Sequence, residues 1–380
     1  MTSRPHILIA IDSFKGSISS YDAASAIERG LKKIDSNVKV EKVPLADGGE
    51  GTVEAIISYA KGSYVTATVH DPLMRNVSAV YGLFNNNETA VLEMAAASGI
   101  GLLSEDERDP AIATTYGTGE LILDALNKNC GSIIIGIGGS ATNDGGVGMA
   151  MALGAKLLDY DGQDIGYEPQ NFSKLYSIDF SQIDPRIKNM KITVLCDVNN
   201  PLVGKNGASH VYGSQKGADK KMIELLDANL KHLADVTEME LGRSFRNIAG
   251  AGAAGGLGFG LVAFLGARLQ SGINFLTEFV NLEKKIRESD IVITGEGKVD
   301  SQTMFNKLPV GIAELAKKHN KKTICIAGQF EKEAFRMHGE QFDEMYFIME
   351  EVVNNEDAMS NAAEHLERIA SEKLKHLLRN

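Results

Sequence analysis

Hydrophobic residues recur along this chain with two different periods, which predict strands and helices in alternation. Short runs of consecutive branched apolar residues, at 7–11, 132–135 and 291–294, are typical of strands buried on both faces of a parallel sheet. Other segments place apolar residues three or four positions apart, as in 220–241, and predict amphipathic helices. The further predicted strands are 38–43, 64–69, 77–84, 89–92, 192–196, 323–327 and 345–349, and the further helices are 52–60, 118–127, 147–153, 309–319 and 358–378. Another helix is expected after a cap at Ser19 or Ser20, with Ile27, Leu31 and Ile34 on its apolar face. The pattern predicts an α/β fold.

The two ends of the chain share a sequence pattern that the middle lacks. Near both termini, buried strands lead into polar loops and then helices, whereas residues from 63 onward alternate like antiparallel strands. At 380 residues the chain is also too long for one ordinary core. We therefore predict a Rossmann/flavodoxin-like parallel-sheet domain formed by residues 1–70 plus 289–380, and an inserted mixed α/β domain at 71–288.

Composition narrows the class of protein. The formal net charge of −11 and the lack of a basic block argue against a nucleic-acid partner. Cys130, Cys196 and Cys325 lie far apart in or beside apolar runs, which is typical of buried reduced thiols. The N-terminus has no apolar signal-peptide core, so we expect a cytoplasmic protein. The apolar stretch 249–269 is crowded with glycine, which favours a buried helix with a glycine-rich entry loop over a membrane span.

A strand, a glycine-rich loop and a helix follow one another at 132–149. Glycines allow close backbone approach to a ligand, and the unpaired N–H groups of a first helical turn attract anions. A carboxylate at Asp144 would repel phosphate unless a metal or a proton transfer is involved. We interpret the loop as a cradle for one anionic end of a ligand, and its candidate binding residues are Gly138, Gly139, Ser140, Thr142, Asn143 and Asp144.

The same loop contains Gly136-x-Gly138-x-x-Ala141, the dinucleotide-binding fingerprint with its permitted alanine. A helix should begin inside that fingerprint, but Asn143-Asp144-Gly145-Gly146 interrupts it. An NAD-dependent dehydrogenase is therefore an alternative, and a glycine turn that merely packs a helix on a sheet is another.

Acids, lysines and glycines recur where other strands end. Asp12-Ser13-Phe14-Lys15-Gly16-Ser17 offers Lys15 for a phosphoryl group and Ser13 or Ser17 for its oxygens, or else a solvated lysine with serine caps. Asp47, Gly48 and Gly49 follow a strand, with Glu50 as an acid that favours a helix N-terminus. Asp197 ends a strand. Another strand end is followed by the same combination of glycines, acids and a lysine, in Gly295-Glu296-Gly297-Lys298-Val299-Asp300.

This recurrence indicates phosphoryl transfer, which needs acids for Mg²⁺ and a base, lysines for phosphate charge, and glycines for backbone approach. Neither a P-loop nor a protein-kinase catalytic loop is present. The candidate catalytic residues are Lys15, Asp47, Asp197, Lys298 and Asp300, and the candidate metal ligands are Asp47, Asp197 and Asp300. Gly295 and Glu296 join Ser13, Ser17, Gly48 and Gly49 as candidate binding residues. The histidines lack metal spacing, and those of predicted helices, His319, His365 and His376, are expected at the surface.

Four of these segments, 11–16, 46–51, 136–146 and 294–300, resemble the bacterial type I glycerate kinases, as does the glycine-rich stretch 250–260. The resemblance implies transfer of the γ-phosphate of ATP to D-glycerate with Mg²⁺, giving 2-phosphoglycerate. It also implies two α/β domains with the active site in the cleft between them. A kinase that makes 3-phosphoglycerate and a non-enzymatic sensor of sugar acids remain alternatives. The expected partners are small molecules, with no nucleic acid and no membrane, for a monomer or homodimer.

Overall fold

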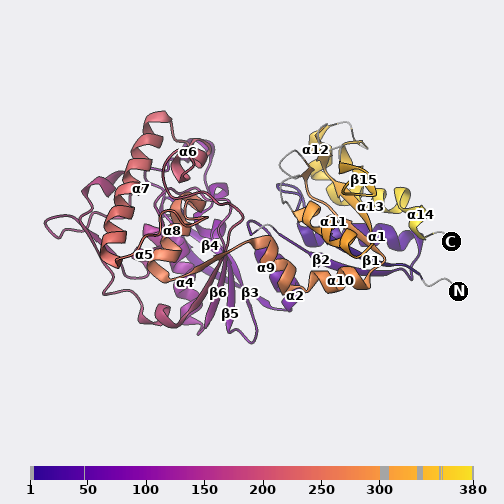
Figure 1. The fold of residues 1–380 in the computed structure, drawn as a ribbon, viewed down its shortest axis with the longest axis horizontal. Coiled ribbons are helices and arrows are strands. Elements are labelled where there is room, and N and C mark those ends of the chain that lie inside the picture. The colour runs from indigo at the N-terminus through magenta and orange to yellow at the C-terminus, as the bar shows by residue number, and fades with distance from the viewer. Residues whose placement is uncertain are drawn as a thin grey trace. The chain divides into compact units, whose positions relative to one another are not determined.

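The computed structural model describes residues 4–46, 48–299, 308–331, 337–350, 352 and 354–378 (Figure 1). The chain divides into two compact units. Unit 1 comprises Met1–Asp47, Glu54–Tyr59 and Ile273–Asn380, and unit 2 comprises Gly48–Val53 and Ala60–Gly272. Asp47 and Asp300, two of the predicted catalytic residues, lie outside the described residues. Each unit is built on its own sheet.

Unit 1 contains a parallel sheet of five strands in the order β15-β13-β11-β1-β2 (Figure 1). The strands are β1 (His6–Ile11), β2 (Lys39–Pro44), β11 (Ile291–Thr294), β13 (Lys322–Ala327) and β15 (Glu344–Phe347). Counted in chain order within the sheet, they run 2-1-3-4-5, so the direction of winding reverses between β1 and β11. Residues of β1 and β11 are buried throughout, which explains their uninterrupted apolar runs.

Helices α1 (Ser20–Ile34) and α13 (Ala362–Lys373) pack on each other in unit 1. A Cβ on Gly30 would lie 2.3 Å from the carbonyl oxygen of Glu367, so only glycine permits this approach. Ser19, one of the two serines expected to cap this helix, accepts a hydrogen bond from the N–H of Asp22. The remaining elements of this part of the chain are α2 (Thr52–Ala60), α9 (Gly272–Phe279), α10 (Leu282–Glu288), α11 (Leu308–Lys318), β12 (Lys298–Val299) and β14 (Gln329–Phe330).

Unit 2 contains a mixed sheet of six strands in the order β10-β9-β6-β5-β4-β3. Four neighbours are parallel, namely β10 (Arg268–Gln270), β9 (Lys191–Leu195), β6 (Ser132–Gly136) and β5 (Thr89–Glu93). The antiparallel edge consists of β4 (Asn76–Phe84) and β3 (Ser63–His70), which confirms the predicted hairpin. A parallel sheet and a mixed sheet together confirm the α/β class.

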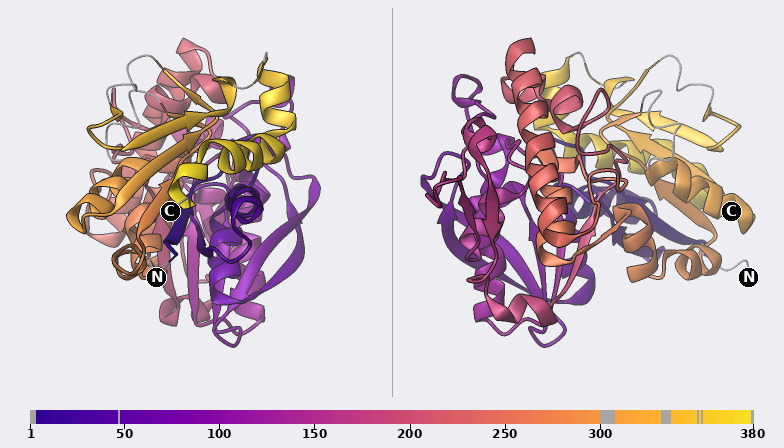
Figure 2. Two further views of the ribbon diagram at one scale, coloured as in Figure 1. Left: turned by 90° about the vertical axis from the view of Figure 1, so that its right-hand side faces the viewer. Right: turned by 60° about the vertical axis from the view of Figure 1, so that its left-hand side comes forward.

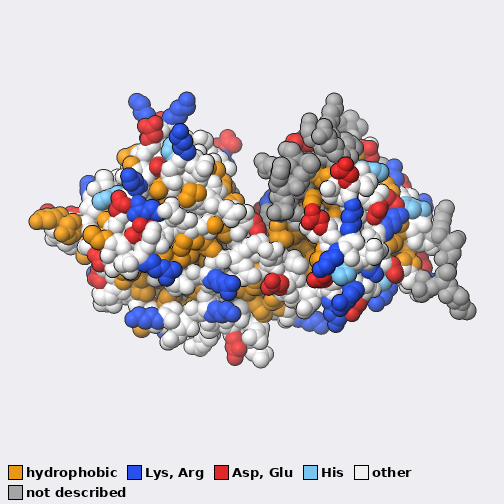
Figure 3. All heavy atoms as spheres, viewed as in Figure 1, with side chains coloured by type: hydrophobic (Ala, Val, Ile, Leu, Met, Phe, Trp, Pro, Cys, Tyr) orange, Lys and Arg blue, Asp and Glu red, His pale blue; other side chains and the backbone are white. Residues whose placement is uncertain are grey.

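The helices of unit 2 include α4 (Tyr116–Asn127), α5 (Val147–Ala152), α7 (Lys220–Leu241) and α8 (Ala253–Leu265). Figure 2 shows α7 beside α8, where Leu230 and Leu233 share a core with Phe259. No helix among the described residues is long and apolar enough to cross a membrane. Shorter elements are α3 (Ala95–Ser98), α6 (Ala208–Tyr212), η5 (Ser214–Lys216), β7 (Lys156–Leu158) and β8 (Ser177–Asp179). Positive and negative side chains are interspersed on the face drawn in Figure 3.

The predicted single helix at 358–378 is wrong, because the chain forms α12 (Asn355–Ser360), α13 and α14 (Lys375–Leu378) instead. The breaks fall at Asn361 and Leu374, whose backbones leave the helical region while apolar side chains still face the core. His365 is buried rather than exposed, since α13 turns it inward. Cys130 and Cys325 are buried free thiols as expected, but Cys196 is partly exposed.

Candidate active site

The carboxyl ends of β1 and β11 bring two predicted motifs together in unit 1. The N–H of Asp12 donates to the carbonyl oxygen of Gly295 over 3.0 Å. A Cβ on Gly297 would lie 3.1 Å from the Cα of Phe14, so the two loops touch through their backbones. Because the direction of winding reverses between these strands, this is the edge at which open α/β sheets bind ligands.

Two buried hydroxyls at this edge have no hydrogen-bond partner among the described residues. They are Ser13 Oγ and Thr294 Oγ1. Buried polar groups are nearly always hydrogen-bonded, so both hydroxyls mark a place for a polar ligand or water. Ser17 differs, because its hydroxyl already donates to the carbonyl oxygen of Met359 over 2.6 Å. Ser13 therefore fits its predicted binding role better than Ser17.

Lysines provide the positive charge at this edge. The side chain of Lys15 is exposed, and that of Lys298 lies 2.7 Å from Glu331 Oε1. The Lys298–Glu331 pair is almost half exposed on both sides, and such pairs contribute little to stability. The ion pair with Glu331 by itself therefore restrains Lys298 only weakly.

The carboxyl edge of the unit 2 sheet collects a second set of predicted residues. A Cβ on Gly136 would lie 2.6 Å from the carbonyl oxygen of Gly48, and one on Gly138 would lie 2.8 Å from the Cα of Gly49. Gly48 itself has a φ of +81°. The loop after β2 and the loop after β6 are thus in backbone contact that only glycines allow.

Asp197 lies at the same edge, two residues beyond β9, with an exposed side chain. The hydroxyl of Ser271, which directly follows β10, donates to Asp197 Oδ1 over 2.6 Å. Asp197 Oδ2 lies close to Gly272, where a Cβ would approach it to 2.9 Å. Ser271 therefore orients the carboxylate, and nothing in the sequence pattern pointed to this serine.

The inner half of the central loop is buried. The carboxylate of Asp144 is fully buried and accepts hydrogen bonds from the N–H and hydroxyl of Thr115, both at 2.7 Å, and from the N–H groups of Gly146 and Gly148. Burial raises the pKa of Asp144, and these four donors oppose that shift. The carboxylate of Asp144 thus binds the N–H groups at the N-terminus of α5 that we expected a ligand anion to bind. The anion-cradle interpretation is therefore wrong for the N-terminus of α5, because the protein's own carboxylate satisfies it.

Thr142 and Asn143 are also fully buried, whereas residues nearer the start of the loop keep some exposed surface. Asn143 Nδ2 donates to Ser209 Oγ over 3.0 Å. Gly139 is exposed, and Ser140 keeps a small exposed surface. The loop therefore presents Gly138, Gly139 and Ser140 at the edge of the sheet and anchors the residues that follow.

A lysine that sequence reasoning missed contributes to this anchoring. Lys216, at the end of η5, is 1% exposed, and its Nζ donates to Ser140 Oγ over 2.7 Å and to the carbonyl oxygen of Thr142 over 2.6 Å. Burial lowers the pKa of Lys216 to about 7, against the opposing effect of the negative charge of Asp144. Its sequence context resembles an ordinary polar loop, which gave no signal.

Glu93, the last residue of β5, is a second residue that the sequence analysis missed. It accepts a hydrogen bond from the N–H of Val53 over 2.8 Å, at the beginning of α2. Burial raises the pKa of Glu93 to about 7; backbone N–H donors oppose this shift, and the nearby charge of Glu50 adds to it. The N-terminus of α2, like that of α5, is therefore satisfied by an internal carboxylate.

The described residues contain no group of three or more histidine, cysteine, aspartate or glutamate side chains that could hold a metal ion. Mg²⁺ does not require one, since it is commonly held by one or two carboxylates, substrate phosphates and waters. The exposed carboxylate of Asp197, oriented by Ser271, fits such a ligand set.

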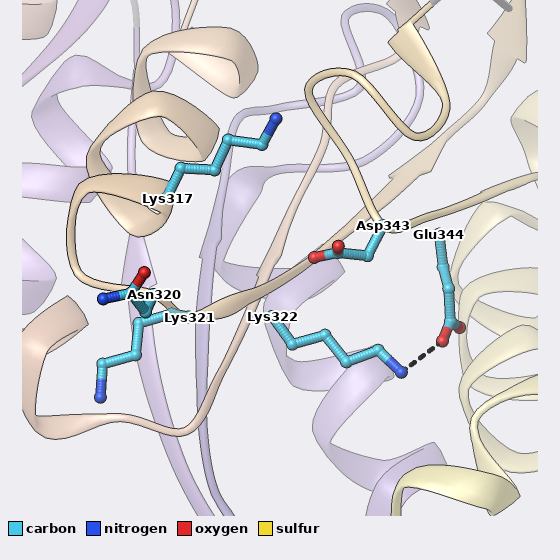
Figure 4. Close-up of a pocket in the computed structure, with 6 residues that line it drawn as sticks. All are labelled: Lys317, Asn320, Lys321, Lys322, Asp343 and Glu344. Carbon is cyan, nitrogen blue, oxygen red and sulfur yellow. Dashed lines mark ion pairs between the residues drawn. The ribbon is translucent and has the colours of Figure 1, made fainter.

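A pocket of about 500 Å³ lies elsewhere in unit 1 (Figure 4). It is lined by Lys317, Asn320, Lys321, Lys322, Asp343 and Glu344. These residues lie at the end of α11 and at the amino ends of β13 and β15, and Lys322 pairs with Glu344 across 2.6 Å. Because parallel sheets bind ligands at the opposite, carboxyl edge, we do not assign this pocket to the active site.

The dehydrogenase alternative does not fit the loop that suggested it. Helix α5 begins at Val147, beyond Ala141, whereas the dinucleotide fingerprint places its helix directly on the pyrophosphate. The N–H groups of Gly146 and Gly148 already bind Asp144. The glycines instead allow the close contact with Gly48 and Gly49.

Comparisons with known proteins agree with the kinase interpretation. Residues 7–378 match the model of the glycerate kinase family. The chain is 47% identical over 364 residues to a glycerate kinase of Bacillus subtilis strain 168, covering 96% of this chain and 95% of that protein. It is 47% identical over 360 residues to a glycerate 2-kinase of Escherichia coli K12, covering 95% and 94%.

A solved structure matches the whole fold as well. A crystal structure from Salmonella typhimurium LT2, provisionally described as glycerate kinase 2, aligns with a TM-score of 0.85 and 44% identity. The alignment covers 99% of this chain and 98% of that one. Because the family model matches almost the full length of this chain, the chain belongs to the glycerate kinase family.

Proposed function

We propose that this protein is a glycerate 2-kinase, which transfers the γ-phosphate of ATP to the 2-hydroxyl of D-glycerate. The observation that carries the proposal is the 47% identity to the Escherichia coli glycerate 2-kinase across nearly the whole of both chains. The carboxyl edges of the two sheets supply residue types that phosphoryl transfer uses, namely lysines, hydroxyls, glycines and an exposed carboxylate.

The lysines of unit 1 are proposed to bind anionic groups. Lys15 and Lys298 would neutralise phosphate oxygens or the substrate carboxylate, and Ser13 would donate its hydroxyl to one of these oxygens. The orphan hydroxyls of Ser13 and Thr294 support a polar ligand at this edge. Gly295 and Glu296 lie in the same loop, which contacts the end of β1.

The loops of unit 2 are proposed to position the reacting groups. The contact between Gly48, Gly49 and Gly138 places the backbone of two loops at the carboxyl edge of the sheet, where Asp197 is exposed. Asp197 would bind Mg²⁺, with Asp47 and Asp300 as further proposed ligands, and the ion would neutralise charge on the phosphates of ATP. One of these carboxylates would accept the proton of the glycerate hydroxyl, which needs no unusual pKa when the transition state is loose.

We also infer that the two compact units are the two domains of the enzyme. The strand order 2-1-3-4-5 of unit 1 supports a flavodoxin-like domain that contains both chain termini. On this interpretation the domain boundaries lie at 47/48 and 272/273 rather than at the predicted 70/71 and 288/289. Residues Glu54–Tyr59 of α2 also belong to unit 1, although they lie between two segments of unit 2.

The test is an assay with D-glycerate and Mg-ATP, coupled to enolase but lacking phosphoglycerate mutase. We expect phosphoenolpyruvate to form directly, because only 2-phosphoglycerate is a substrate of enolase. If ADP forms without phosphoenolpyruvate, the 2-position is wrong and phosphorus NMR identifies 3-phosphoglycerate or free phosphate. Removing Mg²⁺ with EDTA should abolish turnover, and full activity in EDTA would exclude the metal.

A further inference from the structure

Lys216 is an unusual residue to find inside a domain. Only 1% of its surface is exposed, yet lysines are almost never fully buried unless they are paired. Two oxygens accept hydrogen bonds from its Nζ, Ser140 Oγ at 2.7 Å and the carbonyl oxygen of Thr142 at 2.6 Å. Both belong to the loop that follows β6. This lysine is therefore directed at the part of the loop that reaches the carboxyl edge of the sheet.

The direction of these hydrogen bonds constrains Ser140. When Lys216 is protonated its ammonium group can only donate, so Ser140 Oγ then acts as the acceptor of the bond from Lys216. The hydroxyl proton of Ser140 then has to point to another acceptor. Within the described residues no hydrogen bond uses that proton, and Ser140 remains 8% exposed. It follows directly on the half-buried Gly138 and the exposed Gly139.

We propose that Lys216, in its protonated form, is a positioning residue that directs the hydroxyl of Ser140 to donate a hydrogen bond to an anionic oxygen of a substrate. This inference rests on the proposed kinase function and adds to it a residue that acts through Ser140. The anionic oxygen belongs either to the carboxylate of glycerate or to a phosphate of ATP, and both are acceptors of the same kind.

The surroundings of the loop support this role. Asp144 fixes the residues after Ser140 through Thr115 and the first turn of α5, and the bond from Ala141 N–H to the carbonyl oxygen of Ser98 fixes them on the other side. With these anchors the loop is held, so Lys216 acts mainly on the hydroxyl and on the local charge.

Steady-state kinetics of four variants test the inference, with D-glycerate and ATP varied in turn. S140A and K216M should each raise the KM for one and the same substrate about 10- to 100-fold, the loss expected for a hydrogen bond to a charged group, with a smaller change in kcat. The double variant K216M/S140A should be no worse than K216M, because both changes remove one interaction. S140T, which keeps the hydroxyl, should recover most of the affinity. The substrate whose KM rises identifies the carboxylate or the phosphate.

Asn229 provides a matched control. It is 4% exposed in the same unit, and its Nδ2 donates to the carbonyl oxygen of Pro169 over 2.9 Å. N229A should lower the melting temperature without changing either KM. An unchanged KM in S140A, or additive losses in the double variant, would overturn the role of Lys216. Because S140A is a small change, it keeps the test valid even if K216M folds poorly.

Binding without turnover separates this inference from the proposed function. The melting temperatures of the wild type and S140A are compared with D-glycerate, ADP or inorganic phosphate alone. If the wild type does not phosphorylate glycerate, the kinase proposal fails, but S140A should still lose the stabilisation given by whichever anion binds. If S140A is stabilised as much as the wild type, or if none of the three anions stabilises the wild type, the inference on Lys216 is wrong.

Discussion

Ser271 donates a hydrogen bond of 2.6 Å to Asp197 Oδ1, and the two residues follow the adjacent parallel strands β10 and β9. Residues 74 positions apart in sequence thereby form one polar pair at the carboxyl edge of the sheet. The serine fixes the direction of an otherwise exposed carboxylate. Of the three proposed metal-binding carboxylates, Asp197 is the one that lies within the described residues, and Ser271 orients it.

S271A should lower kcat/KM about 10-fold while D197N lowers it further, since a hydrogen bond to a charged group contributes about 1.5–3 kcal/mol. The matched control is S244A. Ser244 also donates to a carboxylate, Glu238 Oε1 at 3.0 Å, but it lies after α7 rather than at the end of a strand. Equal kinetics for S271A and S244A would show that the Ser271–Asp197 pair is not part of the active site.

K298M should lower kcat/KM about 100-fold if Lys298 contacts a phosphate or carboxylate in the bound state. Its partner Glu331 provides the control, because E331Q removes the ion pair and keeps the lysine. An exposed pair contributes roughly 0–1 kcal/mol, so E331Q should stay within about 5-fold of the wild type. The coupled assay measures both, and a K298M enzyme with normal kinetics would remove Lys298 from the proposed site.

E93Q should change how stability depends on pH. The raised pKa of Glu93, about 7, means that the folded protein binds more protons than the unfolded chain between about pH 4.5 and 7. The stability of the wild type therefore carries a penalty that is absent below pH 4.5, grows through this window and is complete above pH 7. The neutral glutamine has no such penalty.

Urea unfolding at pH 5 and pH 8 measures the effect. The free energy of unfolding of E93Q relative to the wild type should be roughly 2 kcal/mol more favourable at pH 8 than at pH 5. The side-chain amide of glutamine keeps a carbonyl oxygen as acceptor for the N–H of Val53, and any effect of the substitution that does not depend on pH cancels in the comparison. Parallel pH curves for the two proteins would show that Glu93 titrates normally.

G255A should destabilise the protein by about 3 kcal/mol or more. Gly255 has a φ of +66°, and a Cβ there would lie 1.9 Å from the carbonyl oxygen of Thr142. The substitution therefore combines left-handed backbone strain with a clash against the central loop.

G242A isolates the first of these two effects. Gly242 has a φ of +64° after α7, but a Cβ there would meet nothing within 4 Å. It should cost only about 1 kcal/mol in chemical unfolding. Similar losses for both variants would mean that the backbone around Gly255 moves away from Thr142 easily.

The sequence by itself determined most of the elements, because local rules set them. Helices α2 (Thr52–Ala60) and α7 (Lys220–Leu241) and strand β11 (Ile291–Thr294) have the predicted bounds. Apolar periodicity, caps and glycine turns act within a few residues, so they are readable in one chain. The same holds for the loops at strand ends, and these loops carry the motifs that resemble glycerate kinases.

Contacts between distant segments were decided only by the tertiary structure. The sequence around Lys216 and Glu93 does not indicate a role for either residue. Lys216 acquires its role by donating to the carbonyl oxygen of Thr142, and Glu93 by accepting from the N–H of Val53. Asp144 was recognised as an unusual acid, but its burial depends on Thr115, which folding brings to it. Whether a polar side chain faces a ligand or satisfies the protein's own helix depends on which groups folding places around it, and sequence spacing does not contain that information.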